Sequence, residues 1–377
     1  MHIIYFLTYD YSFESWSKDG NLSREIKYFN EFQKKSTDIV YTFISYGNKN
    51  DTEYFKKFEN NNLISIYEYV PYFKNKYLRF LVSLTIPFVL RKILKNKKID
   101  LIKQNQLQGS WVSMIFKFLI KKPYIVRTGY DVLTFKQKEN KPKFIILFYN
   151  ILTKACLSIA DIYTVTSKVD KSFLKNRFKK DKKIKLRRNF IEVNNTNNNI
   201  SSKETKIVCV GRLEKQKNFK YIINELKDTS LPIEIFGSGS QRNELNNLIS
   251  NVKNQVTLMG QRENEEIINY LNSRKYFISS SLYEGNPKGV LEAMSQGCIV
   301  FVSKNENTSE IINNGVDGFL YNLEKGELKN YFASDFLNHV DLEIISTNAK
   351  NKVSIQNSLE KLVELEISDF NQLIQKQ

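Results

Sequence analysis

The sequence predicts an α/β protein of two domains, each built on a parallel β-sheet, and three observations support this prediction. The chain has 377 residues, which is long for one domain and sufficient for two of about 150 to 200 residues each. Short apolar runs alternate with helical patterns in both halves, as in parallel sheets whose strands are joined by helices. A polar stretch at 193–205 separates the halves, and the charge balance changes there.

The charge of the chain is unevenly distributed. Residues 1–200 hold 37 Lys and Arg against 17 Asp and Glu, whereas residues 201–377 hold 20 against 23. The stretch VNNTNNNISSKET has five Asn in thirteen residues, which is the composition of a linker. The domain boundaries that we expect are therefore an N-terminal domain at 1–192, a linker at 193–205, a C-terminal domain at 206–352 and a closing helical segment at 353–377.

The expected elements follow the alternating order of parallel α/β sheets. The chain opens with a buried strand at 2–7, and the second half opens with KIVCV at 206–210, which ends at Gly211. Further strands are expected at 231–236, 255–259, 276–280 and 298–302. Ligands of such sheets gather at the carboxyl ends of the strands, so the site is expected in the Gly and Ser turns found there. The last segment, 354–377, has apolar residues at helical spacing and is expected to be one packing helix.

Cysteine usage and hydropathy restrict the compartment and the membrane topology. Three scattered Cys without a Cys-x-x-Cys pair suit a reducing compartment and argue against a disulfide framework or a structural zinc site. We expect no signal peptide before the first strand. Two apolar runs, Phe80–Leu90 and Phe144–Leu152, are shorter than the about 20 residues that span a bilayer. Each is either a buried core helix or a helix lying partly in the membrane interface, with flanking Lys and Arg on lipid head groups.

The basic first half predicts an anionic partner, for which nucleic acid and anionic lipid are the candidates. A Lys-rich composition shared across the source proteome is the alternative explanation. No helix-turn-helix, zinc or RNP signature is present, and a nucleic-acid-binding role leaves the acidic second half unexplained. We therefore expect an anionic membrane surface, and no nucleic acid, as a partner.

The segment SSSLYEGNPKGVLEAMSQG, residues 279–297, is expected to carry the chemistry. A strand ends near its start, a tight loop follows, and Pro287 opens a helix that Gly297 closes. Free backbone N–H groups at such a helix start, with Gly285 and Gly289 allowing close approach, form an anion site suited to phosphate.

Two carboxylates belong to this segment. Glu292, in the second turn of the expected helix, can accept hydrogen bonds from the two hydroxyls of a ribose. Glu284 lies at the start of the loop, and the Glu-x7-Glu element in the setting YEGNPKGVLEAMSQG resembles the signature of family 4 glycosyltransferases. The resemblance continues through 210–218, 235–245, 256–267 and 309–320. In the first half it is weaker and is limited to Gly20, 121–131, 158–174 and 188–192.

Members of that family have two Rossmann-like domains facing across a cleft, the GT-B architecture, with a C-terminal helix that crosses back to the first domain. The resemblance implies retaining transfer of a sugar from a nucleotide-diphosphate sugar, most simply UDP- or GDP-linked, to a glycan or lipid-linked acceptor. It places the reaction in cell-surface polysaccharide biosynthesis, in the cytoplasm at the membrane face, with no cofactor.

The resemblance also assigns roles to individual residues. Arg212 and Lys217 would hold the donor diphosphate, where two cations neutralise the charge that develops on the leaving group. Glu292 would bind the ribose, and Glu284 would contact the transferred sugar. The expected catalytic residues are thus Glu284, Arg212 and Lys217. The expected donor-binding residues besides Glu292 are Gly285, Asn286, Pro287, Lys288, Gly289, Gly211, Gly237, Ser238, Gly239 and Gly20.

The first domain departs from the family pattern. Family members often carry a His in the loop that reads RTGYD here, whereas the two His of this chain, His2 and His339, lie in no matching motif. The candidates for sugar contacts in this loop are therefore Gly129, Tyr130 and Asp131. No Asp-x-Asp motif occurs in the chain, so we expect metal-independent chemistry. The resemblance implies a front-face mechanism in which the leaving phosphate accepts the acceptor proton.

Other interpretations make different demands on these residues. An NAD-type oxidoreductase needs Gly-x-Gly-x-x-Gly after the first strand, and the loop at 8–20 lacks it. In the second half, Arg242 stands where such a fingerprint needs its third Gly. The simpler explanation of the charged residues is structural: Glu284 as a helix cap, Glu292 as a solvated helical residue, and the two cations as ordinary surface charges.

Overall fold

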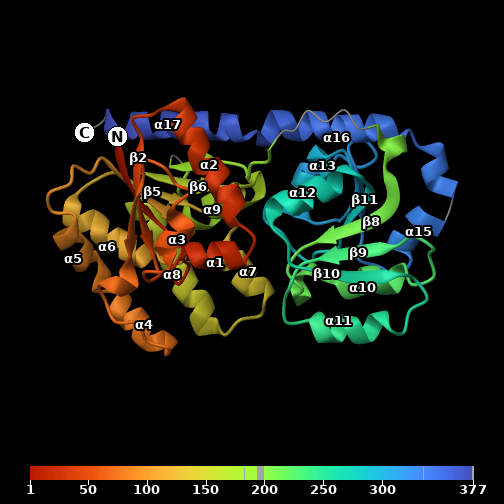
Figure 1. The fold of residues 1–377 in the computed structure, drawn as a ribbon, viewed down its shortest axis with the longest axis horizontal. Helices are drawn as coiled ribbons and strands as arrows, with labels where there is room; N and C mark the ends of the chain where they lie inside the picture. The colour runs from red at the N-terminus through yellow and green to blue at the C-terminus, as the bar shows by residue number, and fades with distance from the viewer. Residues whose placement is uncertain (182, 193–198, 334, 376–377) are drawn as a thin grey trace. The chain divides into compact units, whose positions relative to one another are not determined.

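The computed structural model describes residues 1–181, 183–192, 199–333 and 335–375. The chain forms two compact units, one made of Met1–Arg187 with Glu360–Gln377 and the other of Arg188–Leu359 (Figure 1). Residues 193–198 of the predicted linker lie outside the described residues. The rest of that stretch contains a short 3₁₀ helix, Ile200–Ser202, and the start of strand β8.

The first unit, unit 1, is built on a seven-stranded parallel sheet in the order β3-β2-β1-β4-β5-β6-β7. Its strands are β1 (His2–Phe6), β2 (Val40–Ser45), β3 (Asn62–Ser65), β4 (Leu101–Asn105), β5 (Tyr124–Arg127), β6 (Ile162–Val165) and β7 (Ile184–Leu186). The chain order reverses between β1 and β4, which is the topological switch point of this sheet.

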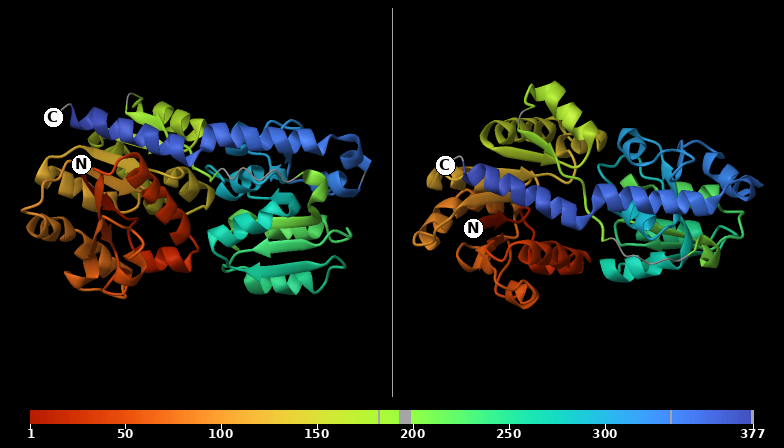
Figure 2. Two further views of the ribbon diagram at one scale, coloured as in Figure 1. Left: turned by 45° about the horizontal axis from the view of Figure 1, so that its top comes forward. Right: turned by 90° about the horizontal axis from the view of Figure 1, so that it is seen from above.

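Ten α-helices, with their loops, surround this sheet in the described part of unit 1. They are α1 (Phe13–Lys18), α2 (Leu22–Lys35), α3 (Asp51–Phe55), α4 (Lys76–Ser83), α5 (Ile86–Ile93), α6 (Ser110–Ile120), α7 (Val132–Lys138), α8 (Lys143–Ile159), α9 (Lys168–Phe178) and α17 (Leu359–Ile374). The last of these comes from the far end of the chain and lies along unit 1 (Figure 2). It buries Val363 and Phe370 completely, and the Phe370 ring stacks on Phe32 of α2 with 5.8 Å between ring centroids.

A buried ion pair joins α17 to the sheet of unit 1. The Lys103 ammonium on β4 donates to Glu366 Oε2 at 2.7 Å and to the Tyr28 hydroxyl at 2.7 Å, and Tyr28 donates in turn to Glu366. Burial disfavours charge on Glu366, but Lys103 and Arg127 outweigh it and hold the pKa of this carboxyl below its usual value. Burial lowers the pKa of Lys103, and Glu366 opposes that shift.

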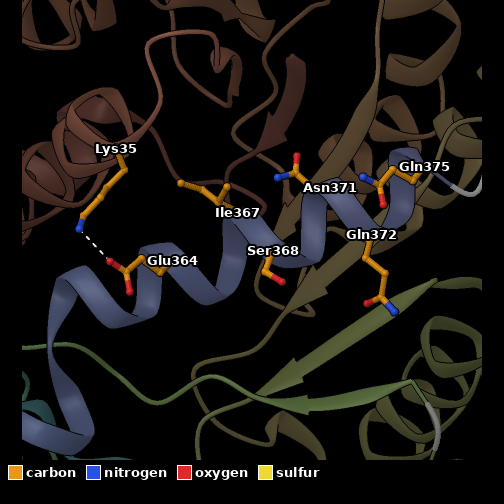
Figure 3. A pocket seen from close by; sticks show the side chains of 7 residues that line it. All are labelled: Lys35, Glu364, Ile367, Ser368, Asn371, Gln372 and Gln375. Carbon is orange, nitrogen blue, oxygen red and sulfur yellow. Dashed lines mark hydrogen bonds and ion pairs between the residues drawn. The ribbon is translucent and has the colours of Figure 1, made fainter.

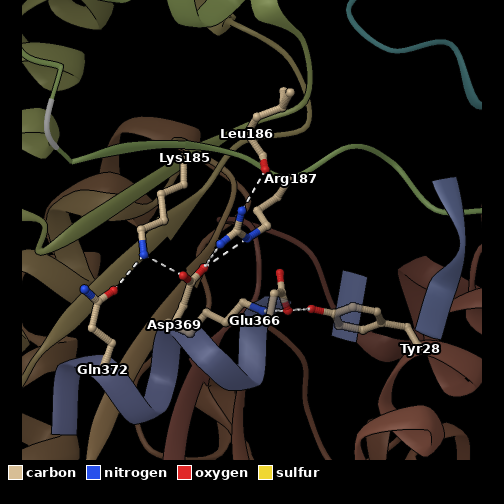
Figure 4. A network of polar contacts seen from close by, with 8 residues as sticks. Tyr28, Lys185, Leu186, Arg187, Glu366, Asp369 and Gln372 are labelled. Atoms are coloured by element: carbon tan, nitrogen blue, oxygen red, sulfur yellow. Dashed lines mark hydrogen bonds and ion pairs between the residues drawn. The ribbon is translucent and has the colours of Figure 1, made fainter. Parts of the chain in front are cut away.

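A second carboxylate of α17 forms a neighbouring polar network (Figure 4). Asp369 accepts from Lys185 Nζ on one oxygen and from Arg187 on the other, each at 2.6 Å. A pocket opens beside α17, but it contains no predicted site residue. Its lining residues are Lys35, Glu364, Ile367, Ser368, Asn371, Gln372 and Gln375 (Figure 3).

The second unit, unit 2, has a six-stranded parallel sheet in the order β10-β9-β8-β11-β12-β13. Its strands are β8 (Glu204–Val210), β9 (Ile233–Phe236), β10 (Val256–Gly260), β11 (Arg274–Ser279), β12 (Ile299–Ser303) and β13 (Phe319–Tyr321). Its helices are α10 (Phe219–Glu225), α11 (Arg242–Ile249), α12 (Asn264–Asn272), α13 (Lys288–Ser295), α14 (Glu306–Ile311), α15 (Glu327–Ala333) and α16 (Leu342–Asn357). The five strands predicted in this half are present, with ends shifted by one or two residues, and the switch point lies between β8 and β11. The prediction of two Rossmann-like parallel-sheet domains is confirmed.

The prediction of one continuous helix over 354–377 is wrong. Helix α16 ends at Asn357, and α17 begins at Leu359. Between them Ser358 leaves the helical conformation, with φ −58° and ψ 134°. Here the Ile191 N–H donates to the Asn357 carbonyl at 2.8 Å, so pairing with the segment that enters unit 2 interrupts the helix.

The two apolar runs of the first half each divide between core and surface. Phe80–Leu90 is shared by α4 and α5, and Leu90 is fully buried, whereas Leu81 and Phe88 are 59% and 58% exposed. Phe144–Leu152 lies in α8 and divides in the same way. The exposed side of each run excludes a fully buried core helix, and the interfacial alternative stays a prediction. Over the described ranges, no helix has the length and apolar character needed to cross a membrane.

Candidate active site

Three loops meet at the carboxyl edge of the sheet in unit 2, where β8, β9 and β11 end. The loop after β8 donates from Leu213 N–H to the Ser238 carbonyl of the loop after β9 at 2.8 Å. The loop after β11 donates from Leu282 N–H to the Gln216 carbonyl at 2.8 Å. The loop after β8 is thus held on both sides, next to the switch point between β8 and β11 where parallel sheets bind ligands.

Two glycines of the predicted donor site are required by this loop packing. Gly237 has φ +143°, and a Cβ there would lie 1.9 Å from the Gly211 carbonyl oxygen. A Cβ on Gly239 would lie 2.6 Å from the Leu213 carbonyl oxygen. Close approach of the two backbones therefore accounts for both glycines without a ligand. The Ser238 hydroxyl between them donates to Gln261 and lies at the surface.

Lys217 and Glu284 form an ion pair at this edge. The Lys217 stem crosses Gly211, where an added Cβ would lie 3.0 Å from Lys217 Cε, so the glycine allows the lysine to reach across the strand end. Glu284 is 8% exposed, and its carbonyl accepts from Asn307 Nδ2 at 2.6 Å. The pair is largely shielded from water, so Lys217 is not an ordinary surface charge and Glu284 does not cap α13.

Arg212 differs from Lys217 in being exposed and in forming no ion pair with a described residue. The nearby Glu214 accepts from Ser240 N–H at 2.9 Å and from the Ser240 hydroxyl at 2.7 Å. These hydrogen bonds lower the pKa of Glu214. Because Ser240 engages this carboxylate, the Arg212 guanidinium remains available to an anion. The contact between Glu214 and Ser240 was not predicted from the sequence.

The segment from Pro287 to Gly297 has the helix geometry predicted for it, with a shift of one residue at the start. Pro287 is the N-cap, with φ −69° and ψ 104°, and α13 begins at Lys288. The N-cap residue makes no side-chain hydrogen bond to the first N–H groups of α13. Gly297 has φ +71° and follows the helix as a C-terminal cap. At Gly289 an added Cβ would meet Phe277 and Val210 only at ordinary contact distance, so packing within unit 2 does not demand this glycine.

Glu292 is buried in the second turn of α13. It is 6% exposed, and Oε1 accepts from Asn264 Nδ2 of α12 at 2.8 Å. A solvated helical glutamate is therefore the wrong description, since the carboxylate is held in a fixed position by its neighbour.

Asn286 has a structural role in addition to the one predicted for it. Its side-chain oxygen accepts from Asn189 N–H at 3.2 Å, and its carbonyl accepts from Asn189 Nδ2 at 2.7 Å. Asn357 Nδ2 donates to the Asn189 carbonyl at 2.7 Å, which extends the network to the end of α16. The side-chain nitrogen of Asn286, Nδ2, is buried without a hydrogen-bond partner. This nitrogen, unlike the side-chain oxygen, is therefore available for another contact. Gly285 is buried next to it.

The remaining predicted residues lie in unit 1. Gly20 has φ +67° and is buried in the turn between α1 and α2, so it does not belong to the turn directly after β1. Gly129 N–H donates to Gln106 Oε1 at 2.8 Å. Tyr130 is exposed, and its ring packs on Phe135.

Asp131 is the N-cap of α7. It is 3% exposed, and its Oδ2 accepts from Thr134 N–H at 2.7 Å and from the Thr134 hydroxyl. Burial raises the pKa of Asp131. Its Oδ1 is buried without a partner, so a sugar could contact this oxygen only after a local rearrangement.

These features define a class of protein. A switch point of a parallel sheet, with two cations, two buried carboxylates and an α-helix start around it, is the arrangement of a domain that binds an anionic nucleotide. Throughout the described ranges, no group of three or more His, Cys, Asp or Glu is placed to hold a metal ion.

Comparisons with known proteins specify the activity of this class. Residues 190–351, which all lie in unit 2, match the family model Glycosyl transferases group 1. The chain is 25% identical over 289 residues to UDP-Gal:alpha-D-GlcNAc-diphosphoundecaprenol alpha-1,3-galactosyltransferase of Escherichia coli, across 70% of this chain and 73% of that protein. It is 26% identical over 242 residues to the capsular polysaccharide biosynthesis glycosyltransferase CapH of Staphylococcus aureus, across 60% of this chain and 66% of that one.

The fold is also similar to that of a structure solved with its ligand, HepE. The crystal structure of HepE from Anabaena in complex with UDP-glucose matches with a TM-score of 0.75 at 17% identity, covering 98% of this chain and 100% of that chain. The chain is thus a glycosyltransferase enzyme of the GT-B fold.

Proposed function

We propose that this enzyme transfers a sugar from a nucleoside-diphosphate sugar, with retention of anomeric configuration, to a glycan or lipid-linked acceptor of cell-surface polysaccharide synthesis. The observation that carries the proposal is the ion pair of Lys217 and Glu284 beside the unpaired Arg212 at the switch point of unit 2. Lys217 is paired with Glu284, and the Glu214 carboxylate near Arg212 accepts hydrogen bonds from Ser240, so the exposed Arg212 guanidinium is the cation most available to a diphosphate.

Each part of the donor has a proposed partner. Arg212 and Lys217 hold the diphosphate, assisted by the backbone from Lys288 to Gly289 at the start of α13. Glu292, fixed by Asn264, accepts hydrogen bonds from the ribose. Glu284 contacts the transferred sugar, and the Lys217 ammonium that it accompanies in the free enzyme is then shared with the phosphate.

The names of the relatives support a choice of donor and acceptor. One relative uses UDP-Gal and a diphosphoundecaprenol-linked sugar, and the matching HepE structure contains UDP-glucose. We therefore propose a UDP-sugar in preference to a GDP-sugar, and a lipid-linked acceptor at the cytoplasmic face of the membrane. Nucleic acid is not part of this proposal, since no observation on the structure favours it.

The proposed chemical step balances within donor and acceptor. The bond from the anomeric carbon to the diphosphate oxygen breaks while a bond to the acceptor oxygen forms on the same face. The acceptor proton passes to the departing phosphate, whose charge Arg212 and Lys217 stabilise. No cofactor enters this step, and the two cations occupy the role that a divalent metal has in other transferases.

Calorimetric titration tests the proposal. UDP, GDP and ADP are titrated into the wild-type enzyme and into Lys217→Met, with Lys215→Met from the same loop as the matched control. We expect one nucleotide, UDP, to bind tightest and the Lys217 variant to lose at least about tenfold in affinity, which corresponds to about 1.4 kcal/mol. Absence of binding by all three nucleotides, or an equal loss in the Lys215 control, would contradict the proposed site.

Retention is tested separately by proton NMR of the product formed from a UDP-sugar of known anomeric configuration. The proposal requires the same configuration in the product as in the donor. An inverted product would refute the front-face step while leaving the binding site in place.

A further inference from the structure

Two helical segments of unit 1 present apolar stripes to solvent. Along α4 and α5 the stripe consists of Tyr77, Leu81, Leu84 and Phe88, which are between 37% and 70% exposed. Tyr77 and Leu81 lie one turn apart on α4, Leu84 lies in the turn that follows α4, and Phe88 lies on α5. Monomeric soluble proteins rarely leave a continuous apolar stripe of this kind open to water, so a partner is implied.

Helix α8 presents a second stripe of the same character. It consists of Phe144, Leu147, Phe148 and Ile151, which are between 39% and 72% exposed and again lie at helical spacing. The opposite side of α8 buries Leu152, Cys156 and Leu157 in the core of unit 1. The outer stripe is therefore not needed for folding of this helix onto the sheet.

An aromatic cluster joins the two stripes into one surface. Phe80 of α4 contacts Trp111 of α6 and Phe148 of α8, with ring centroids 5.3 Å and 6.4 Å apart, and Trp111 lies 6.1 Å from Phe148. Trp111 Nε1 also donates to Ser83 Oγ at 2.9 Å, which fixes α4 against α6. Helices α4, α5, α6 and α8 accordingly gather in one part of unit 1 (Figure 1). We call the two stripes together the α4–α8 face.

The segments that carry this face are strongly basic. Residues 69–99 and 140–160 contain eleven Lys and Arg and no Asp or Glu. Arg79 pairs with Asp10, and Lys141 lies 3.9 Å from Glu139. Exposed lysines such as Lys92, Lys95 and Lys97 form no ion pair with a described residue. The apolar face thus has a margin of uncompensated positive charge.

We propose that the α4–α8 face docks on an anionic lipid bilayer, with its aromatic and aliphatic side chains in the interface and its lysines on the head groups. This combination of apolar centre and basic margin is the one that interfacial lipid binding uses. A second copy of the chain would bring the uncompensated lysines of the two copies together, which opposes self-association. Nucleic acid would match the charge but has no use for the aliphatic residues Leu81, Leu147 and Ile151.

The inference deepens the proposed function, on which it rests for the identity of the acceptor. If unit 1 receives a lipid-linked acceptor, docking holds the enzyme where that acceptor is anchored. The surface residues named here are distinct from the donor-site residues of unit 2, so the two proposals can fail independently.

Vesicle sedimentation tests the docking. The wild-type enzyme is mixed at low salt with vesicles of phosphatidylcholine containing phosphatidylglycerol, and with vesicles of phosphatidylcholine alone. The test variants are Leu81→Ser/Phe88→Ser and Phe144→Ser/Leu147→Ser, whose side chains are all exposed. The matched control is Ile344→Ser/Ile355→Ser on α16 of unit 2, which removes side chains that are 57% and 65% exposed.

We expect wild-type enzyme and the α16 control to bind the anionic vesicles at least about tenfold more tightly than either test variant, and to lose binding as salt is raised. A charge variant, Lys92→Glu/Lys95→Glu/Lys97→Glu, should lose anionic-vesicle binding as well, whereas Lys253→Glu/Lys325→Glu/Lys329→Glu of unit 2 should retain it. UDP titration on every variant monitors the donor site, so unchanged UDP binding with lost vesicle binding supports docking.

Four results would overturn the inference. The first is wild-type enzyme that stays in the supernatant when anionic vesicles are sedimented. The second is wild-type enzyme that binds neutral vesicles as tightly as anionic ones, and the third is an α16 control that loses as much vesicle binding as the test variants. The fourth is wild-type enzyme that forms a dimer, binds no vesicles and becomes monomeric in the test variants.

Discussion

Removing the charge of Glu366 tests whether α17 is an integral part of unit 1. Glu366→Gln keeps a side chain of the same size that can still accept a hydrogen bond from Tyr28. The side chains of Lys103 and Glu366 are only 1% and 4% exposed. The substitution therefore leaves the Lys103 ammonium buried without its carboxylate partner. Removing one partner of a buried ion pair costs about 3 to 5 kcal/mol. Such a loss is a large part of the about 5 to 15 kcal/mol by which domains are stable.

Fluorescence during urea unfolding measures this loss selectively. Trp16 and Trp111 are the two Trp of the chain, and both lie in unit 1. For an m-value of about 2 kcal/mol per molar urea, the expected shift of the unfolding midpoint is on the order of 2 M. Because both Trp lie in unit 1, this fluorescence signal reports the unfolding of unit 1, and unit 2, which has no Trp, does not contribute to it.

Two further variants separate the buried pair from other effects. Glu364→Gln removes a charge of the same helix whose partner, Lys35, is at the surface, and exposed pairs contribute little, so the midpoint should hardly move. Lys103→Met/Glu366→Leu replaces the pair by apolar side chains and should recover most of the stability. The reasoning is refuted if Glu366→Gln shifts the midpoint no more than Glu364→Gln does.

The remaining predictions concern catalysis and pH. Arg212→Ala and Glu292→Ala should each lower turnover by at least about tenfold while the far-ultraviolet circular dichroism shows that unit 2 stays folded. Lys215→Ala should retain turnover, and full activity in either of the first two variants would remove its assigned role. Transfer should survive excess EDTA because Arg212 and Lys217 supply the positive charge, and an EDTA loss that Mn²⁺ or Mg²⁺ restores would contradict this. The pKa of Glu366 is held below its ordinary value of 4.5 in the folded state. Its contribution to stability is therefore present above about pH 4.5 and is lost as pH falls through the lower folded value, so urea titrations between pH 3 and 7 should show a flatter acid dependence for Glu366→Gln.

The sheets and the donor loop were predictable because their signals are local. Apolar runs such as Lys206–Val210 fix strand positions to within one or two residues, since each run must be buried on both faces of a parallel sheet. The loop and helix around Glu284 and Glu292 follow from Pro287 and Gly297, whose backbone preferences act within one turn.

Contacts between distant segments were not predictable in this way. Lys103 follows the apolar residues Leu101 and Ile102 in strand β4, and nothing local indicates that Glu366, 263 residues later, neutralises it. The break at Ser358 depends on pairing with Ile191, and the structural role of Asn286 depends on Asn189. Each of these features requires knowledge of the tertiary fold.

The central claim is that the switch point of unit 2 holds the donor diphosphate, and a crystal structure of the enzyme with UDP tests it most directly. The account predicts the diphosphate within hydrogen-bonding distance of Arg212, Lys217 and the N–H groups that start α13, with the ribose hydroxyls on Glu292. UDP bound elsewhere, or bound at this edge with neither cation in contact with its phosphates, would contradict it.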